Sequence, residues 1–236
     1  MIKTNHCAAA SQEERHEPPS RRRLIFLLAI ALSLADLLVL DVAHDVRVWA
    51  HLPKISQWNW FGKSISIAFS CLLLACSPWL RQNVGLRWRQ APGSIRLSLG
   101  CFVTFLACAI GIGFQNPSIP FSADTLMYQF FMPGIAEELM DRGILLALFE
   151  RSFGQSPMSC RLRFGYAALI TSLIFGFGHG VSVDDGRLAF SFLQFSIPTL
   201  IAAALALVRT RSGSLLWPIL CHGTWNGPIF LVRMLQ

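Results

Sequence analysis

Ionisable side chains lie inside three apolar stretches of this chain, where such groups are rare and costly. The first stretch contains the adjacent carboxylates Glu137 and Glu138. The second contains His179, and the third contains His222, followed four residues later by Asn226. A glutamate can act as a general base toward water, and imidazole and amide groups can donate hydrogen bonds to an oxyanion. This set of side chains therefore suffices for hydrolysis of a peptide bond.

The two glutamates have different expected roles. Glu138 and Arg142 are four residues apart and share one helix face, where pairing lowers the cost of burying both charges. Glu137 points about 100° away around an α-helix, so it cannot easily share the same arginine. We therefore expect Glu138 and Arg142 to form a structural ion pair, and Glu137 to be free for chemistry.

The residues around each histidine indicate how the helices approach one another. His179 stands in the sequence Phe175-Gly-Phe-Gly-His179-Gly180, and these glycines permit close contact between helix backbones. His222 and Asn226 are four residues apart, so the imidazole and the amide face the same way. The glutamate, the two histidines and the asparagine are expected to converge from three helices on one buried polar chamber.

The composition of the whole chain indicates a membrane protein. Of 236 residues, 53% are hydrophobic and only 14% are charged, and the mean hydropathy is +0.50. Soluble chains carry about 25% charged residues, and a soluble domain cannot bury so much apolar surface. The same values exclude a disordered chain, a coiled coil and a disulfide scaffold. The net charge of +7 does not indicate nucleic acid, because no soluble basic face accompanies it.

The apolar residues form long runs that fit an all-α, polytopic transmembrane bundle of about seven helices. Each run approaches or exceeds the ~20 residues needed to cross a bilayer. We expect a disordered polar N-terminal tail over 1–23, N-terminal transmembrane helices over 24–124 and a catalytic helical core over 125–236. The predicted spans are 24–43, 61–79, 97–115, 125–149, 166–183, 188–208 and 213–233.

The basic residues predict the orientation of this bundle. With seven spans, fourteen of the 20 Lys and Arg residues fall on the side of the N-terminus, five on the other side, Lys63 among them, and Arg142 lies within a span. Cytoplasmic loops carry the excess of Lys and Arg, so the N-terminus is expected in the cytoplasm. The expected location is the cell (inner) membrane.

Three short motifs give the chain a family resemblance. The patterns EExxxR (Glu137 to Arg142), FxxxH (Phe175 to His179) and HxxxN (His222 to Asn226) occur in that order on successive predicted helices. They resemble the motifs of the CAAX protease and bacteriocin-processing (CPBP, or ABI) family of intramembrane glutamic endopeptidases, which includes the type II CAAX prenyl endopeptidases. The resemblance covers about residues 125–233.

The resemblance implies a role for each residue and a class of partner. Glu137 would be the catalytic base, His179 would help to activate the water, and His222 with Asn226 would form the oxyanion hole. Glu138 and Arg142 would be a supporting pair. No cofactor and no metal are implied, and the substrate would be a membrane-associated protein or peptide, reached within the lipid bilayer.

Two other interpretations remain open from the residues alone. One glutamate and two histidines are also a zinc-ligand set, although the HExxH pattern is absent. The protein would then be a zinc-dependent intramembrane protease. The chamber could also belong to a transporter or to a membrane immunity or binding protein, although the chain shows no internal repeat. Asp36, in the first span, is expected to make a polar contact between helices.

Overall fold

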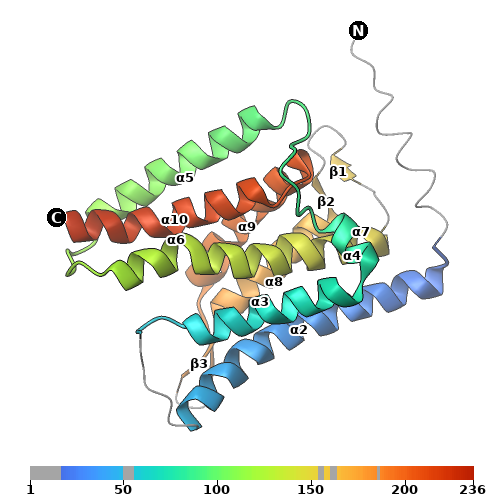
Figure 1. Cartoon of the computed structure of the whole chain (residues 1–236), viewed down its shortest axis with the longest axis horizontal. Helices are drawn as coiled ribbons and strands as arrows, with labels where there is room; N and C mark the ends of the chain where they lie inside the picture. Colours follow the sequence, from blue (N-terminus) through green and yellow to red (C-terminus); the bar gives the residue numbers. More distant parts are fainter. Residues whose placement is uncertain (1–16, 50–55, 154–156, 160–163, 185–186) are drawn as a thin grey trace.

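The computed structural model describes residues 17–49, 56–153, 157–159, 164–184 and 187–236. Most of these residues are helical, which confirms the predicted all-α class (Figure 1). The helices are α2 (Pro19–Trp49), α3 (Trp60–Cys76), α4 (Pro78–Asn83), α5 (Ile95–Gln115), α6 (Ala123–Glu137), the π-helix η2 (Glu138–Leu145), α7 (Leu146–Phe153), α8 (Tyr166–Gly180), α9 (Phe192–Ser212) and α10 (Leu216–Leu235).

Each of the seven predicted spans overlaps a helix, but some boundaries differ. Helix α2 begins at Pro19, so the end of the predicted tail is helical, while residues 1–16 lie outside the described residues. Proline suits the start of a helix because its missing N–H would have no partner there. The predicted span 125–149 is divided among α6, η2 and α7.

Side-chain caps explain several of the helix starts. The side chain of Asn59 accepts a hydrogen bond from the backbone N–H of Gly62 at the beginning of α3. Ser122 and Ser191 cap α6 and α9 in the same way. Helix α3 ends just before the Ser77-Pro78 step, because a residue that precedes proline disfavours the helical conformation.

Two short β-hairpins were not predicted. Strand β1 (Pro157–Ser159) pairs with β2 (Phe164–Gly165), and β3 (Val181–Asp184) pairs with β4 (Arg187–Phe190), both antiparallel. The second hairpin corrects two predicted boundaries, because α8 ends at Gly180 and α9 begins only at Phe192. Valine and phenylalanine suit strands as well as apolar helices, so hydropathy alone did not separate the two.

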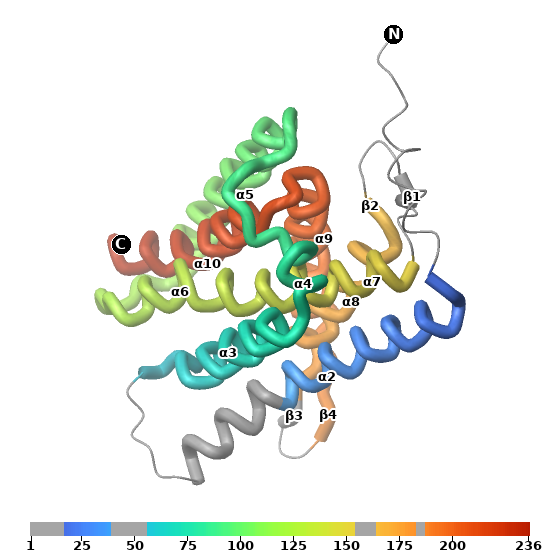
Figure 2. The backbone as a smooth tube through the Cα atoms, turned by 45° about the vertical axis from the view of Figure 1, so that its right-hand side comes forward, coloured from blue at the N-terminus to red at the C-terminus, as the bar shows by residue number. Residues whose placement is uncertain are grey.

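The run from α6 through η2 to α7 crosses the middle of the molecule (Figures 1 and 2). Helix α10 packs against α6 and α5 on one side of this run, and α3 and α2 pack on the other side. Helices α8 and α9 pack against each other and cross behind it. The residues of the central run therefore face helices from both ends of the chain.

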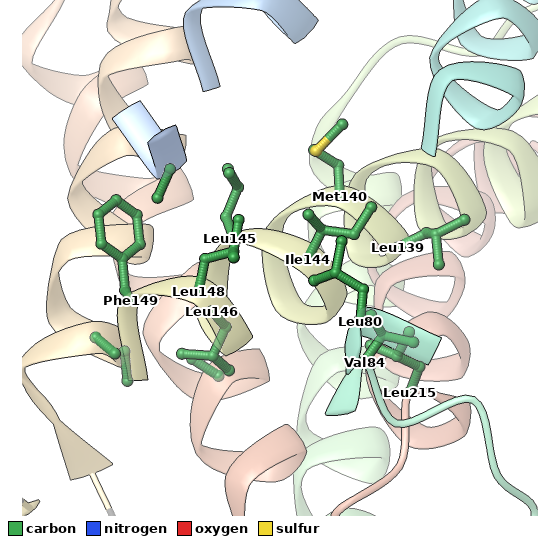
Figure 3. Packing of buried hydrophobic residues seen from close by; sticks show 14 of the residues in the cluster. Leu80, Val84, Leu139, Met140, Ile144, Leu145, Leu146, Leu148, Phe149 and Leu215 are labelled. Atoms are coloured by element: carbon green, nitrogen blue, oxygen red, sulfur yellow. The ribbon is translucent and has the colours of Figure 1, made fainter. Parts of the chain in front are cut away.

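The main apolar core surrounds η2 and α7, the part of the central run that follows the two glutamates in the sequence. Met140, Ile144, Leu145 and Phe149 are almost completely buried there. Figure 3 shows these side chains interleaved with others from α4 and from the loop that precedes α10. Burial of such side chains contributes about 1.5–3 kcal/mol each, so this cluster holds the central run in a fixed register.

Helices α5 and α9 are long and apolar enough to cross a membrane. Helices α3 and α8 are apolar but shorter. Many large apolar side chains on the described surface are exposed, among them Leu24, Val103, Phe114 and Leu200. Such a surface is typical of a protein whose outer face contacts lipid.

Candidate active site

The two adjacent glutamates lie where the central helix changes its winding. Glu137 is the last residue of α6, and Glu138 is the first residue of η2. At the far end of η2, the N–H of Leu146 bonds to the carbonyl of Asp141, five residues earlier, as expected for a π-helix. Such turns are frequent at functional sites because they change the direction of neighbouring side chains.

Glu138 and Arg142 form the ion pair expected from their spacing. Arg142 Nη1 lies 3.0 Å from Glu138 Oε1, and the side chains are 1% and 0% exposed. The Arg142 guanidinium also lies 4.4 Å above the centre of the Phe175 ring, a cation–π contact. Because Glu138 is sealed from solvent, it can support the site but cannot reach a substrate.

His222 contacts both glutamates. Its Nδ1 lies 2.8 Å from Glu138 Oε1, a hydrogen bond, and its Nε2 lies 3.6 Å from Glu137 Oε2. Nδ1 is the donor in this hydrogen bond, because the ionised carboxylate of Glu138 can only accept. The structure thus brings His222 of α10 next to the pair of carboxylates, as the sequence predicted.

Glu137 has a partner that sequence analysis missed. Lys63 Nζ donates a hydrogen bond of 2.7 Å to Glu137 Oε1, and this side chain is 14% exposed against 16% for Glu137. The sequence alone placed Lys63 at one membrane face, whereas in the structure it lies in the first turn of α3 and its side chain reaches Glu137. Its position inside a run of apolar residues was the signal that could have revealed it.

His179 lines the same pocket as Lys63. Its Nδ1 donates to the carbonyl oxygen of Phe175, one helical turn earlier, at 2.9 Å. The His179 and Phe175 rings are in contact, with centroids 4.4 Å apart. The tautomer with a proton on Nδ1 leaves Nε2 as an acceptor when the imidazole is neutral.

The pocket has a volume of about 190 Å³, enough for several water molecules or a short peptide segment. Its wall is formed by α2, α3, the α6–η2 junction and α8. The polar groups that line it are Ser33, Asp36, Lys63, Glu137, Asp141 and His179. Glu137 and His179 therefore face the same space, while His222 lies behind Glu137 and Asn226 is not part of the wall.

Glycines allow α10 to approach α6 closely enough to bring His222 to the glutamates. A β-carbon on Gly223 would collide with the backbone carbonyl of Phe130, and one on Gly227 would meet the Phe130 ring at 2.5 Å. On the other helix, a β-carbon on Gly134 would lie 3.1 Å from the carbonyl of Ile219. Small residues at such spacing are typical of close helix pairs in membranes.

Asn226 is half-buried on α10, one helical turn beyond His222. Within the described residues, no hydrogen bond joins its amide to Glu137, His179 or His222. Its place on the His222 face follows from the helix, and its role remains a prediction.

The other sequence expectations have mixed outcomes. Asp36 accepts a 2.6 Å hydrogen bond from Ser66, so it does make the expected polar contact between α2 and α3. The glycines beside His179 do allow close packing, because β-carbons on Gly176 and Gly180 would collide with Thr199 and Phe195 of α9. Across the described ranges, no group of three or more His, Cys, Asp or Glu side chains has the geometry of a metal site.

The comparisons with known proteins agree with the position of this site. Residues 120–227 match the family model described as type II CAAX prenyl endopeptidase Rce1-like. The predicted resemblance to the CAAX protease family is confirmed. The Rce1-like region begins just before α6 and ends in α10, so it includes both glutamates, both histidines, Arg142 and Asn226, but not Lys63 or Asp36. The family is a family of membrane-embedded proteases.

One curated relative extends the similarity beyond the Rce1-like region. An Escherichia coli protein described as an uncharacterized 24.3 kDa protein is 28% identical over 166 residues, which cover 64% of this chain and 70% of that protein. No solved structure matches the chain. The family therefore rests on the Rce1-like region and on the motifs that it contains.

Proposed function

We propose that this protein is an intramembrane endopeptidase that hydrolyses a peptide bond of a membrane-associated protein or peptide. The observation that carries the proposal is the pocket shared by Glu137 and His179, with His222 directly behind Glu137. The match to a family described as CAAX prenyl endopeptidases supports the same activity. A prenylated or otherwise lipid-anchored substrate fits the apolar surroundings of the pocket.

In the proposed mechanism, Glu137 acts as the general base. Its carboxylate takes a proton from a water molecule in the pocket, and the resulting hydroxide attacks the carbonyl carbon of the peptide bond. The protonated carboxyl then delivers that proton to the leaving nitrogen as the C–N bond breaks. His179 Nε2 accepts a hydrogen bond from the same water and orients it, which follows from the hydrogen bond that occupies its Nδ1.

The tetrahedral intermediate requires hydrogen-bond donors for its oxyanion, and we assign this role to His222 and Asn226. Nδ1 of His222 is engaged with Glu138, so the donor must be an N–H on Nε2. Both ring nitrogens of His222 then carry protons during the reaction. Glu138 and Arg142 support the site by holding this imidazole from behind, since neither is accessible from the pocket.

We propose a multi-pass arrangement with the N-terminus in the cytoplasm of the cell membrane. The two helices that can cross a bilayer and the exposed apolar side chains support insertion. The excess of Lys and Arg on the predicted N-terminal side supports the orientation. The test is to place a single cysteine at the start of α2 or at the end of α5, which the predicted topology puts on opposite faces of the membrane. A membrane-impermeant thiol reagent should then label only one of the two cysteines.

The decisive experiment compares the membrane peptides of cells that carry the wild-type protein or the Glu137→Gln variant. We expect the variant to accumulate uncleaved substrates at normal expression and thermal stability. Glu17→Gln is a matched control, since Glu17 forms an ion pair with Arg151 away from the pocket. Normal cleavage by Glu137→Gln would refute Glu137 as the base. Normal cellular function of a variant that accumulates no uncleaved substrate would favour a binding or transport protein.

A further inference from the structure

Lys63 contacts Glu137 directly, although it lies outside both the family motifs and the Rce1-like match. It lies in the first turn of α3, and its ammonium group is 2.7 Å from Glu137 Oε1. Its side chain is largely buried and borders the pocket. A buried lysine carries a desolvation cost of several kcal/mol, which only a close anionic partner offsets.

The charges around Glu137 show why this contact matters. The Arg142 guanidinium forms an ion pair with Glu138 and lies 3.8 Å from Asp141, so its contacts are with these two carboxylates and not with Glu137. Among the lysines and arginines that the structure describes, Lys63 is the one in contact with Glu137. The other titratable groups that face the pocket are Asp36 from α2, Asp141 from η2 and His179 from α8, with His222 from α10 behind Glu137.

The contact also fixes the direction of the carboxylate. One oxygen, Oε1, accepts from Lys63, and the other, Oε2, is turned toward His222. Without the ammonium group, the carboxylate could rotate about its last torsion, which is broad and poorly restrained. A general base must be within hydrogen-bond reach of the proton that it removes, so this orientation bears directly on catalysis.

We propose that Lys63 is a positioning residue that holds Glu137 as an oriented carboxylate, ready to deprotonate water. This inference rests on the proposed protease function and adds a residue to it. Two adjacent glutamates in an apolar region need two cations to remain ionised together. Arg142 forms the ion pair with Glu138, and Lys63 forms the ion pair with Glu137.

The test is the pH dependence of kcat/KM for the full-length protein in liposomes. The probe is a fluorogenic peptide that spans a cleavage site identified in the proteomic comparison. For Lys63→Met we expect the acid limb to move to higher pH by about 1–3 units, the usual effect of one adjacent charge. Lys63→Arg should keep the wild-type limb, because it retains the cation.

Ser70→Ala is the matched control on the same helix. Ser70 is buried two turns further along α3, and its hydroxyl has no hydrogen-bond partner in the described part of the chain. The control should leave the acid limb unchanged. A purely structural role for Lys63 predicts a lower rate at every pH with an unmoved limb, and that result would overturn the proposal. Faster cleavage by Lys63→Met at every pH would overturn it as well.

An infrared measurement separates this proposal from the protease assignment, because it needs no substrate. Wild-type protein and Lys63→Arg should show the protonated carboxyl band of Glu137 only at the acid end of an infrared pH titration. In Lys63→Met the band should appear at a pH about 1–3 units higher, and it should be absent from the double variant with Glu137→Gln. Lys63→Gln replaces Lys63→Met if the latter does not fold. A folded neutral variant whose band appears at the same pH as in the wild type refutes the role of Lys63, whatever the protein cleaves.

Discussion

Removing the guanidinium of Arg142 is the sharpest test of how the site is held together. In Arg142→Ala, the Glu138 carboxylate stays completely buried and loses its ionic partner at 3.0 Å. Breaking a buried pair from one side costs about 3–5 kcal/mol. Loss of the cation–π contact with Phe175 adds roughly 0.5–2 kcal/mol. The total, about 3.5–7 kcal/mol, approaches the whole stability of an ordinary domain.

A double-mutant cycle in detergent measures this energy. The free energy of unfolding is compared for wild type, Arg142→Met, Glu138→Gln and the double variant. We expect Arg142→Met to be the least stable, and the double variant to recover several kcal/mol, because it leaves no unpaired buried charge. Arg89→Ala, at an exposed position, is the control and should stay within about 0.5 kcal/mol of wild type. An Arg142→Met protein of normal stability would refute the ion pair as the support of Glu138.

Four further predictions concern the packing and the chemistry of the site. Gly223→Ala should destabilise the protein by more than about 2 kcal/mol in thermal unfolding, because its β-carbon collides with the Phe130 carbonyl, and an unchanged melting temperature would contradict the close approach of α10 and α6. His179→Ala should abolish cleavage while the protein folds normally, whereas Asn226→Ala should lower kcat by roughly 10²–10³-fold with little change in KM, as for loss of one oxyanion donor. A stable Asn226→Ala protein with wild-type kcat would remove Asn226 from the mechanism. Cleavage should persist after dialysis against a chelator, and chelator sensitivity with stoichiometric zinc in the purified protein would favour the zinc-dependent alternative.

Periodicity and hydropathy predicted the helices because each apolar run is long and bounded by polar or proline-containing segments. The spacing of Glu138 and Arg142 predicted their ion pair for the same local reason. The glycines beside His179 likewise predicted a close helix contact, which is found with α9. Features that depend on neighbours within one helix were thus readable from the sequence.

Features that depend on distant segments were not readable. Lys63 is 74 residues from Glu137 in the chain, and no local pattern links them. The π-helical winding of η2 was also missed. The sequence predicted that His222 would lie near the glutamates, but not that Nδ1 would bond to Glu138 while Nε2 faces Glu137.

The arrangement of charges explains why the chain carries two adjacent glutamates instead of one. In the proposed mechanism, His222 must be held by a hydrogen bond at Nδ1 if Nε2 is to face the reacting groups. Glu138 provides that acceptor, and Arg142 neutralises it without entering the pocket. Glu137 is then left with Lys63 on Oε1, while its Oε2 is turned toward His222. The difference between the two carboxylates arises from which cation each one meets, and this makes exchange of their roles by mutation unfavourable.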